Sequence, residues 1–324
     1  MHSQGGYTHR GDITAVIMEA DGWEDNLIHN RLAPTITVED EKGEYPVFKK
    51  ASGSLLKREA NIKRAPGANF ARGELGYEWD NYSTEEYGFE IPLDGVSKKK
   101  ADAYFDSAAI TARMAKRKLL LDREIRVATA LFNASTFDAN NSLTAYTIAN
   151  IATFDIGLDV DLAKQVLLAR GESDNNLSLA LSNAVFIRAR ASTKMQNRLR
   201  GIGVASDTIL GVDAAAFAEA LGVKEVIIGK NYYDAAGEGL AYSGTAIYGN
   251  TYMWLGRLGN SGGPEQMLQG GALNTLCWSK YGPEWTVESY MEPQKDSEIF
   301  RVKQYLSEKV VNANVGTLIG TQYS

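Results

Sequence analysis

The chain has 324 residues, of which 44% are hydrophobic and 23% charged, with a formal net charge of −6. This composition predicts a globular protein with a core large enough for one domain or two. The near balance of acids and bases excludes a protein that grips nucleic acid over its whole surface. The single cysteine excludes an internal disulfide. Apolar runs are too short for a signal-peptide core or a membrane span, so we expect a reducing cytoplasm and no membrane contact.

The N-terminal part predicts an arm followed by a short helix and a hairpin. Residues 1–12 are rich in glycine and polar side chains and predict a flexible arm. Apolar residues recur at helical spacing over residues 21–33, so we expect a helix there that ends at Pro34. Residues 35–48 contain two β-rich runs around a charged turn, which predicts a hairpin.

The next stretch divides into a basic half and an acidic half. Residues 49–72 hold seven bases against one acid, and residues 73–94 hold seven acids and no base. In the acidic half, acids alternate with aromatic residues at the period-2 spacing of a strand, and Pro66 and Gly67 mark a bend. One interpretation is an ordinary hairpin with solvated charges.

The other interpretation of this stretch is a protruding loop whose opposed charges pair with each other or with neighbouring subunits. On that interpretation, the contacts come from Lys49, Lys50, Lys57, Arg58, Lys63, Arg64, Glu78, Asp80, Glu85, Glu86 and Glu90.

A long helix is expected from Ser97 to Phe132, because this stretch contains neither glycine nor proline. At about 100° per residue, its apolar side changes midway, so its two ends should pack on different neighbours. Bases outnumber acids on the helix, which indicates either a solvated face or a surface that faces a polyanion. The candidates for polyanion contact are Arg113, Lys116, Arg117, Arg123 and Arg126.

The remaining chain alternates helix and strand. It predicts a compact α+β unit over residues 160–290 and a terminal hairpin that turns at residues 312–314. The expected helices cover residues 160–169, 183–190, 193–199 and 213–221, the last with Gly222 as its C-cap.

No residue pattern predicts a catalytic, cofactor or metal site. The three histidines all precede residue 30, and Cys277 lies in an apolar strand pattern typical of a small buried hydrophobe. GNSGG at residues 259–263 formally fits the G-x-S-x-G pattern around Ser261, but no histidine follows it. There is no P-loop, no paired cysteine and no HExxH motif.

The stretch around the charged loop and the long helix resembles the major capsid proteins of tailed bacteriophages, which have the HK97-like fold. The resemblance is carried by RAPG at 64–67, YSTEEYGFEIPLD at 82–94 and LLLDREIRVATALF at 119–132, and by the order of elements. It implies an α+β capsid fold with an N-terminal arm (1–35), an extended loop (36–95), a peripheral domain (96–175) with a spine helix (97–133), an axial domain (176–292) and peripheral return strands (293–324).

The function that this resemblance implies is a non-enzymatic shell subunit, without cofactors, that forms hexamers and pentamers in an icosahedral head. The head would be assembled in the host cytoplasm, become part of the virion and contact packaged double-stranded DNA non-specifically. No charged helical segment precedes the arm, so a separate scaffolding protein is expected, with portal and decoration proteins as further partners. Two alternatives stay open: an encapsulin nanocompartment of the same fold, and a serine hydrolase built on Ser261.

Overall fold

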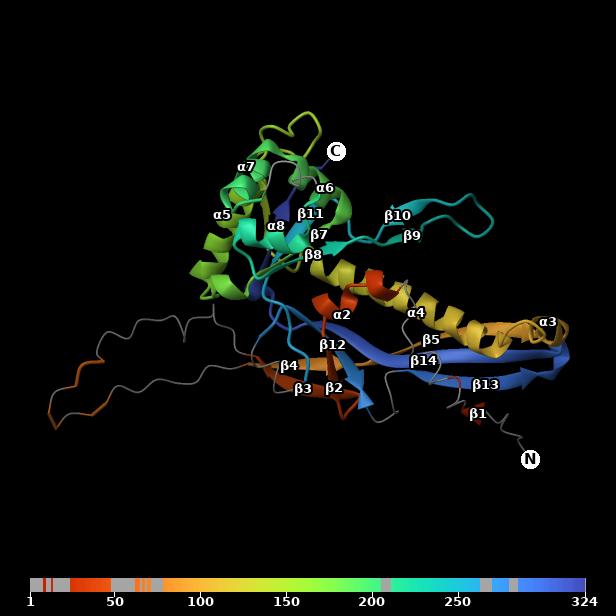
Figure 1. The fold of residues 1–324 in the computed structure, drawn as a ribbon. Helices are drawn as coiled ribbons and strands as arrows, with labels where there is room; N and C mark the ends of the chain where they lie inside the picture. Colours follow the sequence, from red (N-terminus) through yellow and green to blue (C-terminus); the bar gives the residue numbers. More distant parts are fainter. Residues whose placement is uncertain are drawn as a thin grey trace.

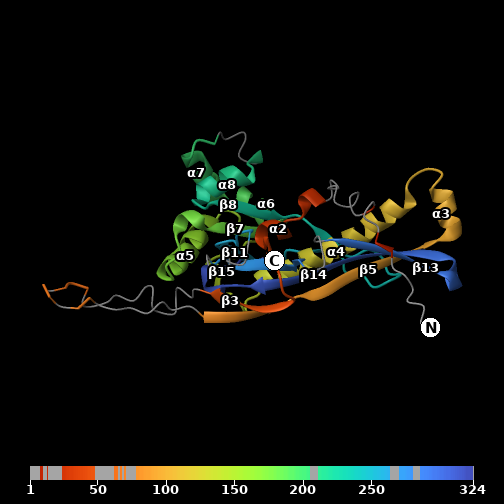
Figure 2. The ribbon, with the colours of Figure 1, turned by 90° about the horizontal axis from the view of Figure 1, so that it is seen from below.

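The computed structural model describes residues 8–9, 13, 24–47, 62–64, 66–67, 69–70, 78–204, 211–262, 270–279 and 285–323. A long sheet with a helix lying along it extends through one half of the molecule, and a second sheet with several helices sits at one end of it (Figure 1). Figure 2 gives the view from below, in which α5, α7 and α8 lie at one end of the molecule and α3 and β13 at the other. No helix in the described ranges is long and apolar enough to span a bilayer.

The larger sheet has six strands. Its order is β1 (Thr8–His9), β13 (Thr286–Glu292), β14 (Ser297–Val310), β12 (Leu273–Trp278) and β2 (Thr35–Val38), and β5 (Glu85–Asp94) also pairs with β14. Phe300 and Val302 of β14 are fully buried against helix α4 (Ser107–Leu131), whereas their neighbour Arg301 lies on the opposite face. This alternation gives the sheet one apolar face and one charged face.

The smaller sheet has five strands, in the order β6 (Ala139–Asn141), β15 (Gly316–Gly320), β11 (Tyr252–Gly256), β7 (Ser178–Ser182) and β8 (Glu225–Gly229). All five residues of β7 are buried, as expected for a central strand that is covered on both faces. The helices around this sheet are α5 (Ile156–Ala169), α6 (Asn183–Ala191), α7 (Thr193–Gly201) and α8 (Ala214–Leu221).

Two further pairs of strands lie outside these sheets: β3 (Lys42–Val47) with β4 (Glu78–Ser83), and β9 (Tyr232–Asp234) with β10 (Gly244–Ala246). Short elements complete the described chain: helices α2 (His29–Leu32) and α3 (Gly95–Ala101), and 3-10 turns at Glu24–Asn26, Asp174–Asn176, Pro293–Lys295 and Ala313–Val315.

The four helices predicted after residue 150 all exist, but the first begins at Ile156 and not at residue 160. Local signals mark the ends of these helices. Asp155 caps α5 by accepting hydrogen bonds from the N–H groups of Gly157 and Leu158, at 3.0 and 3.2 Å. Asp213 caps α8 in the same way, and Gly222 ends it in the left-handed conformation at φ +61°.

The hairpin predicted over residues 35–48 is wrong, although both of its strands exist. β2 pairs in parallel with β12, and β3 pairs antiparallel with β4. Ile36, Val38, Tyr45 and Val47 are nevertheless buried in one apolar cluster with Leu276. The β-rich runs therefore identified the two strands but not the strands with which they pair.

The prediction of one uninterrupted helix from Ser97 to Phe132 is also wrong, because the chain bends between α3 and α4. The Asp102 carboxylate accepts from the Ser107 N–H at 3.3 Å, and Asp106 caps α4 by accepting from the Ala109 N–H at 3.1 Å. Aspartate side chains compete in this way for backbone N–H groups and start a new helix.

The two ends of α4 do pack on different neighbours, as expected. Ala112 and Leu119 contact the larger sheet with Trp285, whereas Leu131 packs with Trp254 of the smaller sheet. The buried residues form one stripe along the helix, so the predicted change of the apolar side midway is wrong.

The terminal hairpin around residues 312–314 is wrong as well. β14 belongs to the larger sheet, whereas β15 pairs with β11 and β6 in the smaller one. The chain therefore crosses between sheets at this point. Sheet membership also cuts across the range 176–292 predicted for the axial domain, because β12 and β13 lie in the larger sheet.

The N-terminal region is more closely tied to the body than a flexible arm would be. Thr8 and His9 pair with β13, and Ile13 is 3% exposed. The helix expected over residues 21–33 lies partly outside the described residues. From Glu24 onward it is a 3-10 turn followed by α2, whose start is held by a carboxylate from α4. We describe that contact below.

Candidate functional site

The tip of the charged loop is exposed and carries the predicted bend. Pro66 and Gly67 form a turn in which Gly67 has φ +81°, a conformation that favours glycine. Lys63 and Arg64 precede the turn, and the Arg64 guanidinium lies 4.3 Å from the centroid of the Phe70 ring. Figure 1 shows this tip well away from both sheets. Lys49, Lys50, Lys57 and Arg58 lie outside the described residues.

Asp80 is used within the subunit, at the root of the loop. Its carboxylate accepts from the Tyr45 hydroxyl at 3.0 Å and pairs with Lys309 of β14 at 3.2 Å. Burial opposes ionisation of Asp80, but hydrogen bonds from the Asn81 N–H, Tyr45 and Lys309 outweigh it and hold its pKa below the usual range.

The exposed acids of β4 and β5 differ in the contacts that the structure gives them. Glu90 lies opposite Arg301 in the β5–β14 register and pairs with it at 2.5 Å. Arg301 also lies 3.7 Å from Glu288, so a short charge network crosses the outer face of the sheet. Glu78, Glu85 and Glu86 are exposed. Among the residues that the structure describes, the ion pairs of Asp80 and Glu90 both join bases of β14.

Two of the five bases predicted to face a polyanion are buried. Lys116 is 5% exposed and pairs with Glu24 at 2.8 Å, and Arg123 is fully buried and donates to the Thr35 hydroxyl at 2.9 Å. Because both side chains are buried and contact residues of the same chain, they stabilise the subunit and do not face a polyanion. Their positions on the apolar stripe of α4 are the sequence signal that could have identified this role.

The other three bases of α4 differ in exposure. Arg126 is partly buried: its guanidinium pairs with Glu308 at 2.9 Å and covers the Tyr87 ring at 3.7 Å from the centroid. Arg113 and Arg117 are exposed and one turn apart. A polyanion could reach these two without any rearrangement of the helix.

A buried polar cluster that the sequence did not reveal joins α2, α4 and the segment before β11. The Glu124 carboxylate accepts from the backbone N–H groups of Ile28 and His29 at 3.1 and 2.9 Å. It also contacts His29 Nδ1 at 2.8 Å and accepts from the Tyr248 hydroxyl at 2.7 Å. Gly229 makes room for this tyrosine, since a Cβ there would lie 2.1 Å from the ring.

The cluster favours the charged form of Glu124. Burial alone would raise the pKa of Glu124, but the contacts with His29, Tyr248 and the Ile28 N–H together lower it. Burial, and then the neighbouring Glu124 charge, raise the pKa of Tyr248 well above its ordinary value. With the Lys116 and Arg123 contacts, this cluster fastens residues 24–35 to α4.

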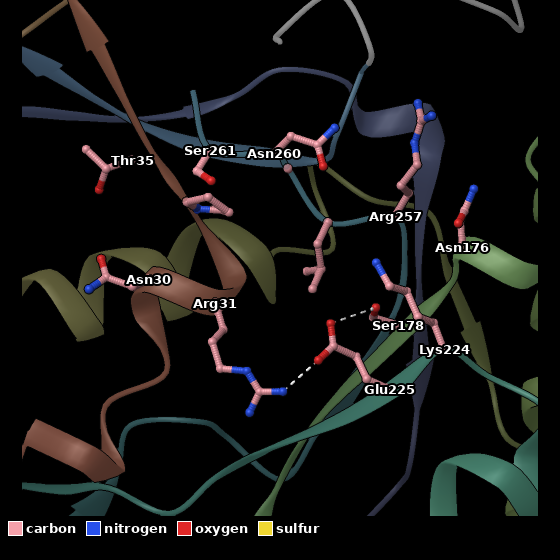
Figure 3. A pocket seen from close by; sticks show the side chains of 13 residues that line it. Asn30, Arg31, Thr35, Asn176, Ser178, Lys224, Glu225, Arg257, Asn260 and Ser261 are labelled. Atoms are coloured by element: carbon pink, nitrogen blue, oxygen red, sulfur yellow. Dashed lines mark hydrogen bonds and ion pairs between the residues drawn. The ribbon is translucent and has the colours of Figure 1, made fainter. Parts of the chain in front are cut away.

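A polar pocket of about 610 Å³ lies between α2, β8 and the segment after β11. In Figure 3, Arg31 and Ser178 both reach the Glu225 carboxylate, at 2.6 and 3.4 Å. Ser261 lines the same pocket, but the elements described on either side of it are the strands β11 and β12, not the strand–turn–helix of a nucleophile elbow.

Other reactive groups are placed as follows. Cys277 forms no disulfide and is 7% exposed, which confirms the predicted small buried hydrophobe. Among the residues that the structure describes, no group of three or more His, Cys, Asp or Glu side chains could hold a metal ion.

Comparisons with known proteins identify the fold through structure. No family model and no curated protein matches the sequence. A phage-related protein from Bordetella bronchiseptica RB50 matches with a TM-score of 0.69 and 19% identity, over 98% of both chains. The capsid of cyanophage P-SCSP1u matches with a TM-score of 0.59 and 10% identity, over 90% of this chain and 86% of that one.

An encapsulin complex, SrpI from Synechococcus elongatus PCC 7942, matches with a TM-score of 0.50 and 13% identity, over 90% of this chain and 85% of that one. Together, these similarities confirm the predicted α+β fold of the HK97-like capsid type.

Proposed function

We propose that this chain is a non-enzymatic shell subunit that self-assembles into an icosahedral head around double-stranded DNA. The observation that carries the proposal is the similarity to the capsid of cyanophage P-SCSP1u, which extends over 90% of this chain at a TM-score of 0.59. The chain would form hexamers and pentamers in the host cytoplasm and become part of the virion. A separate scaffolding protein, portal and decoration proteins would be its further partners.

The distribution of charge supports this proposal. The exposed acids Glu78, Glu85 and Glu86 and the exposed bases Lys63 and Arg64 belong to one loop region, so they can meet neighbouring copies. Complementary charges of this kind steer association and fix register more than they add affinity. The net charge of −6 would limit adhesion of DNA to the shell while the genome is packaged.

Assembly itself can be tested by negative-stain electron microscopy of the purified protein, alone and with a co-expressed scaffolding protein. We expect closed particles in at least one of the two samples. A single monomer peak in size exclusion, with no particles in either sample, would contradict the proposal. Particles that contain a cargo enzyme instead of DNA would favour the second candidate, an encapsulin, whose fold this chain also matches.

Contact with DNA can be tested on Arg113 and Arg117, the exposed bases of α4. Replacing both with glutamine should reduce the slope of log affinity against log salt by about 1.8, because each phosphate contact contributes about 0.9 for duplex DNA. The measurement is DNA binding by the purified subunit across a range of NaCl concentrations. Lys194→Gln on α7 removes an exposed charge elsewhere and serves as the control. An equal change in slope for this control would contradict the assignment to α4.

A further inference from the structure

Helix α5 is apolar on two sides, and only one of them is covered. Ile156, Val160 and Leu167 are fully buried in the core around the smaller sheet. Leu158 and Leu162 lie on the outer side, each 42% exposed. Exposed apolar side chains that gather on one side of a helix often mark a contact with another protein, so this outer side is expected to be covered in the assembled protein.

The outer side of α5 forms one wall of an apolar groove of about 520 Å³. Apolar side chains lining it include Leu162, Val166 and Ile319, and the edge strand β6 contributes Asn140 and Asn141. β6 pairs with β15 on one side, and its other edge is unpaired among the described strands. The groove therefore combines an apolar surface with a strand edge that can accept another strand.

The β9–β10 hairpin carries matching features. Its strands pair only with each other among the described elements, so their outer edges are open. Its connection carries Leu240 and Tyr242, which are 72% and 73% exposed. The turn is nevertheless ordered, because the Asp234 carboxylate accepts from the N–H groups of Ala236 and Ser243 at 3.0 and 2.9 Å.

An isolated two-stranded hairpin is marginally stable in water. A preformed hairpin with exposed apolar residues at its end is therefore a surface that a partner completes. In Figure 1, this hairpin projects from one side of the smaller sheet, whereas α5 lies on the opposite side. The two surfaces of one copy cannot meet each other, but those of two successive copies can.

We propose that the β9–β10 hairpin of one copy inserts its Leu240–Tyr242 end into the groove between α5 and β6 of a second copy. The contact is head to tail, so repetition around an axis closes a ring in which every groove is filled. The proposal rests on the function proposed above, because a closed ring requires several identical subunits.

Cysteine cross-linking in assembled particles tests this contact. The only native cysteine is 7% exposed, so introduced thiols dominate the reaction. A chain with Leu240→Cys and Leu162→Cys should give a ladder of covalent oligomers after mild oxidation, because each copy is linked to the next. Neither single substitution should give such a ladder. The matched control is Leu240→Cys with Met291→Cys, since Met291 is 58% exposed on the larger sheet.

If assembled particles form as few covalent oligomers with the Leu240 and Leu162 pair as with the Met291 control, the proposed contact is wrong. The proposed function is then unaffected, because the particles still form. A chain that stays monomeric would overturn both. Leu240→Asp with Tyr242→Asp provides a second measurement. Both side chains are exposed, so thermal unfolding of the subunit should be unchanged, whereas the yield of particles should fall at least about tenfold, the effect of about 1.4 kcal/mol on an equilibrium. An unchanged yield would contradict the proposal.

Discussion

Replacing Glu124 with alanine is expected to lower the free energy of unfolding of the subunit by about 3–5 kcal/mol, the usual effect of breaking a buried charged contact. The substitution leaves the Ile28 and His29 N–H groups and the Tyr248 hydroxyl without their acceptor. All of these groups lie in the interior, where an unsatisfied donor costs about 1–3 kcal/mol. Urea unfolding at pH 7 measures the effect.

Glu85→Ala is the matched control for this substitution. Glu85 is exposed, and the hydrogen bond from the Tyr87 hydroxyl at 3.1 Å lies at the surface. We expect its effect to stay within about 0.5 kcal/mol. Similar losses for Glu85→Ala and Glu124→Ala would show that the buried cluster contributes no more than an exposed acid.

The stability that Glu124 contributes should also depend on pH. Its pKa in the folded chain is lowered from the ordinary value of 4.5. A group with a lowered folded-state pKa stabilises the protein fully above its unfolded-state pKa, and this contribution is lost as the pH falls through the folded-state value. The difference in unfolding free energy between the natural chain and Glu124→Ala should therefore be constant near neutrality and shrink below about pH 4.5. A difference that does not change with pH would contradict this assignment.

The sequence predicted the helices whose ends carry local signals, but it did not predict which strands pair with each other across long distances in the chain. Asp213 and Gly222 mark the two ends of α8 within the helix itself. The partner of β2 is β12, which lies more than 200 residues further along the chain. Nothing within residues 35–48 indicates that β2 pairs with this distant strand and not with the adjacent β3. The break before α4 has a sequence signal, because Asp106 is a residue type that commonly caps a helix start. The prediction missed it because it relied only on the absence of glycine and proline.

The candidate site was predicted unevenly for the same reason. Alternating acids and aromatic residues identified β5 as a strand, but Arg301, the base that pairs with Glu90 inside the subunit, lies 211 residues away. Lys116 and Arg123 were counted as surface bases because composition does not distinguish the two sides of a helix. The apolar stripe of Ala112, Leu119 and Val127 does distinguish the buried side of α4 from its exposed side.

Reversing Glu85 and Glu86 to lysine should prevent assembly while leaving the folded subunit intact. Both side chains are exposed on β5, and the charge network of the sheet runs through Glu90 instead. If these two acids face bases of a neighbouring copy, reversal places like charges together, which costs several kcal/mol at each contact. The contact recurs in every subunit of a shell, so we expect electron microscopy to find few or no closed particles.

Glu90→Lys separates this effect from simple destabilisation. It places a lysine opposite Arg301 within the subunit, so thermal unfolding should occur at a lower temperature even in the monomer. The Glu85 and Glu86 double variant should instead unfold at nearly the natural temperature and fail only in assembly. Normal particles from the double variant would exclude these acids from the interface and leave Glu78 and the loop tip at Lys63 and Arg64 as the remaining charged contacts to test.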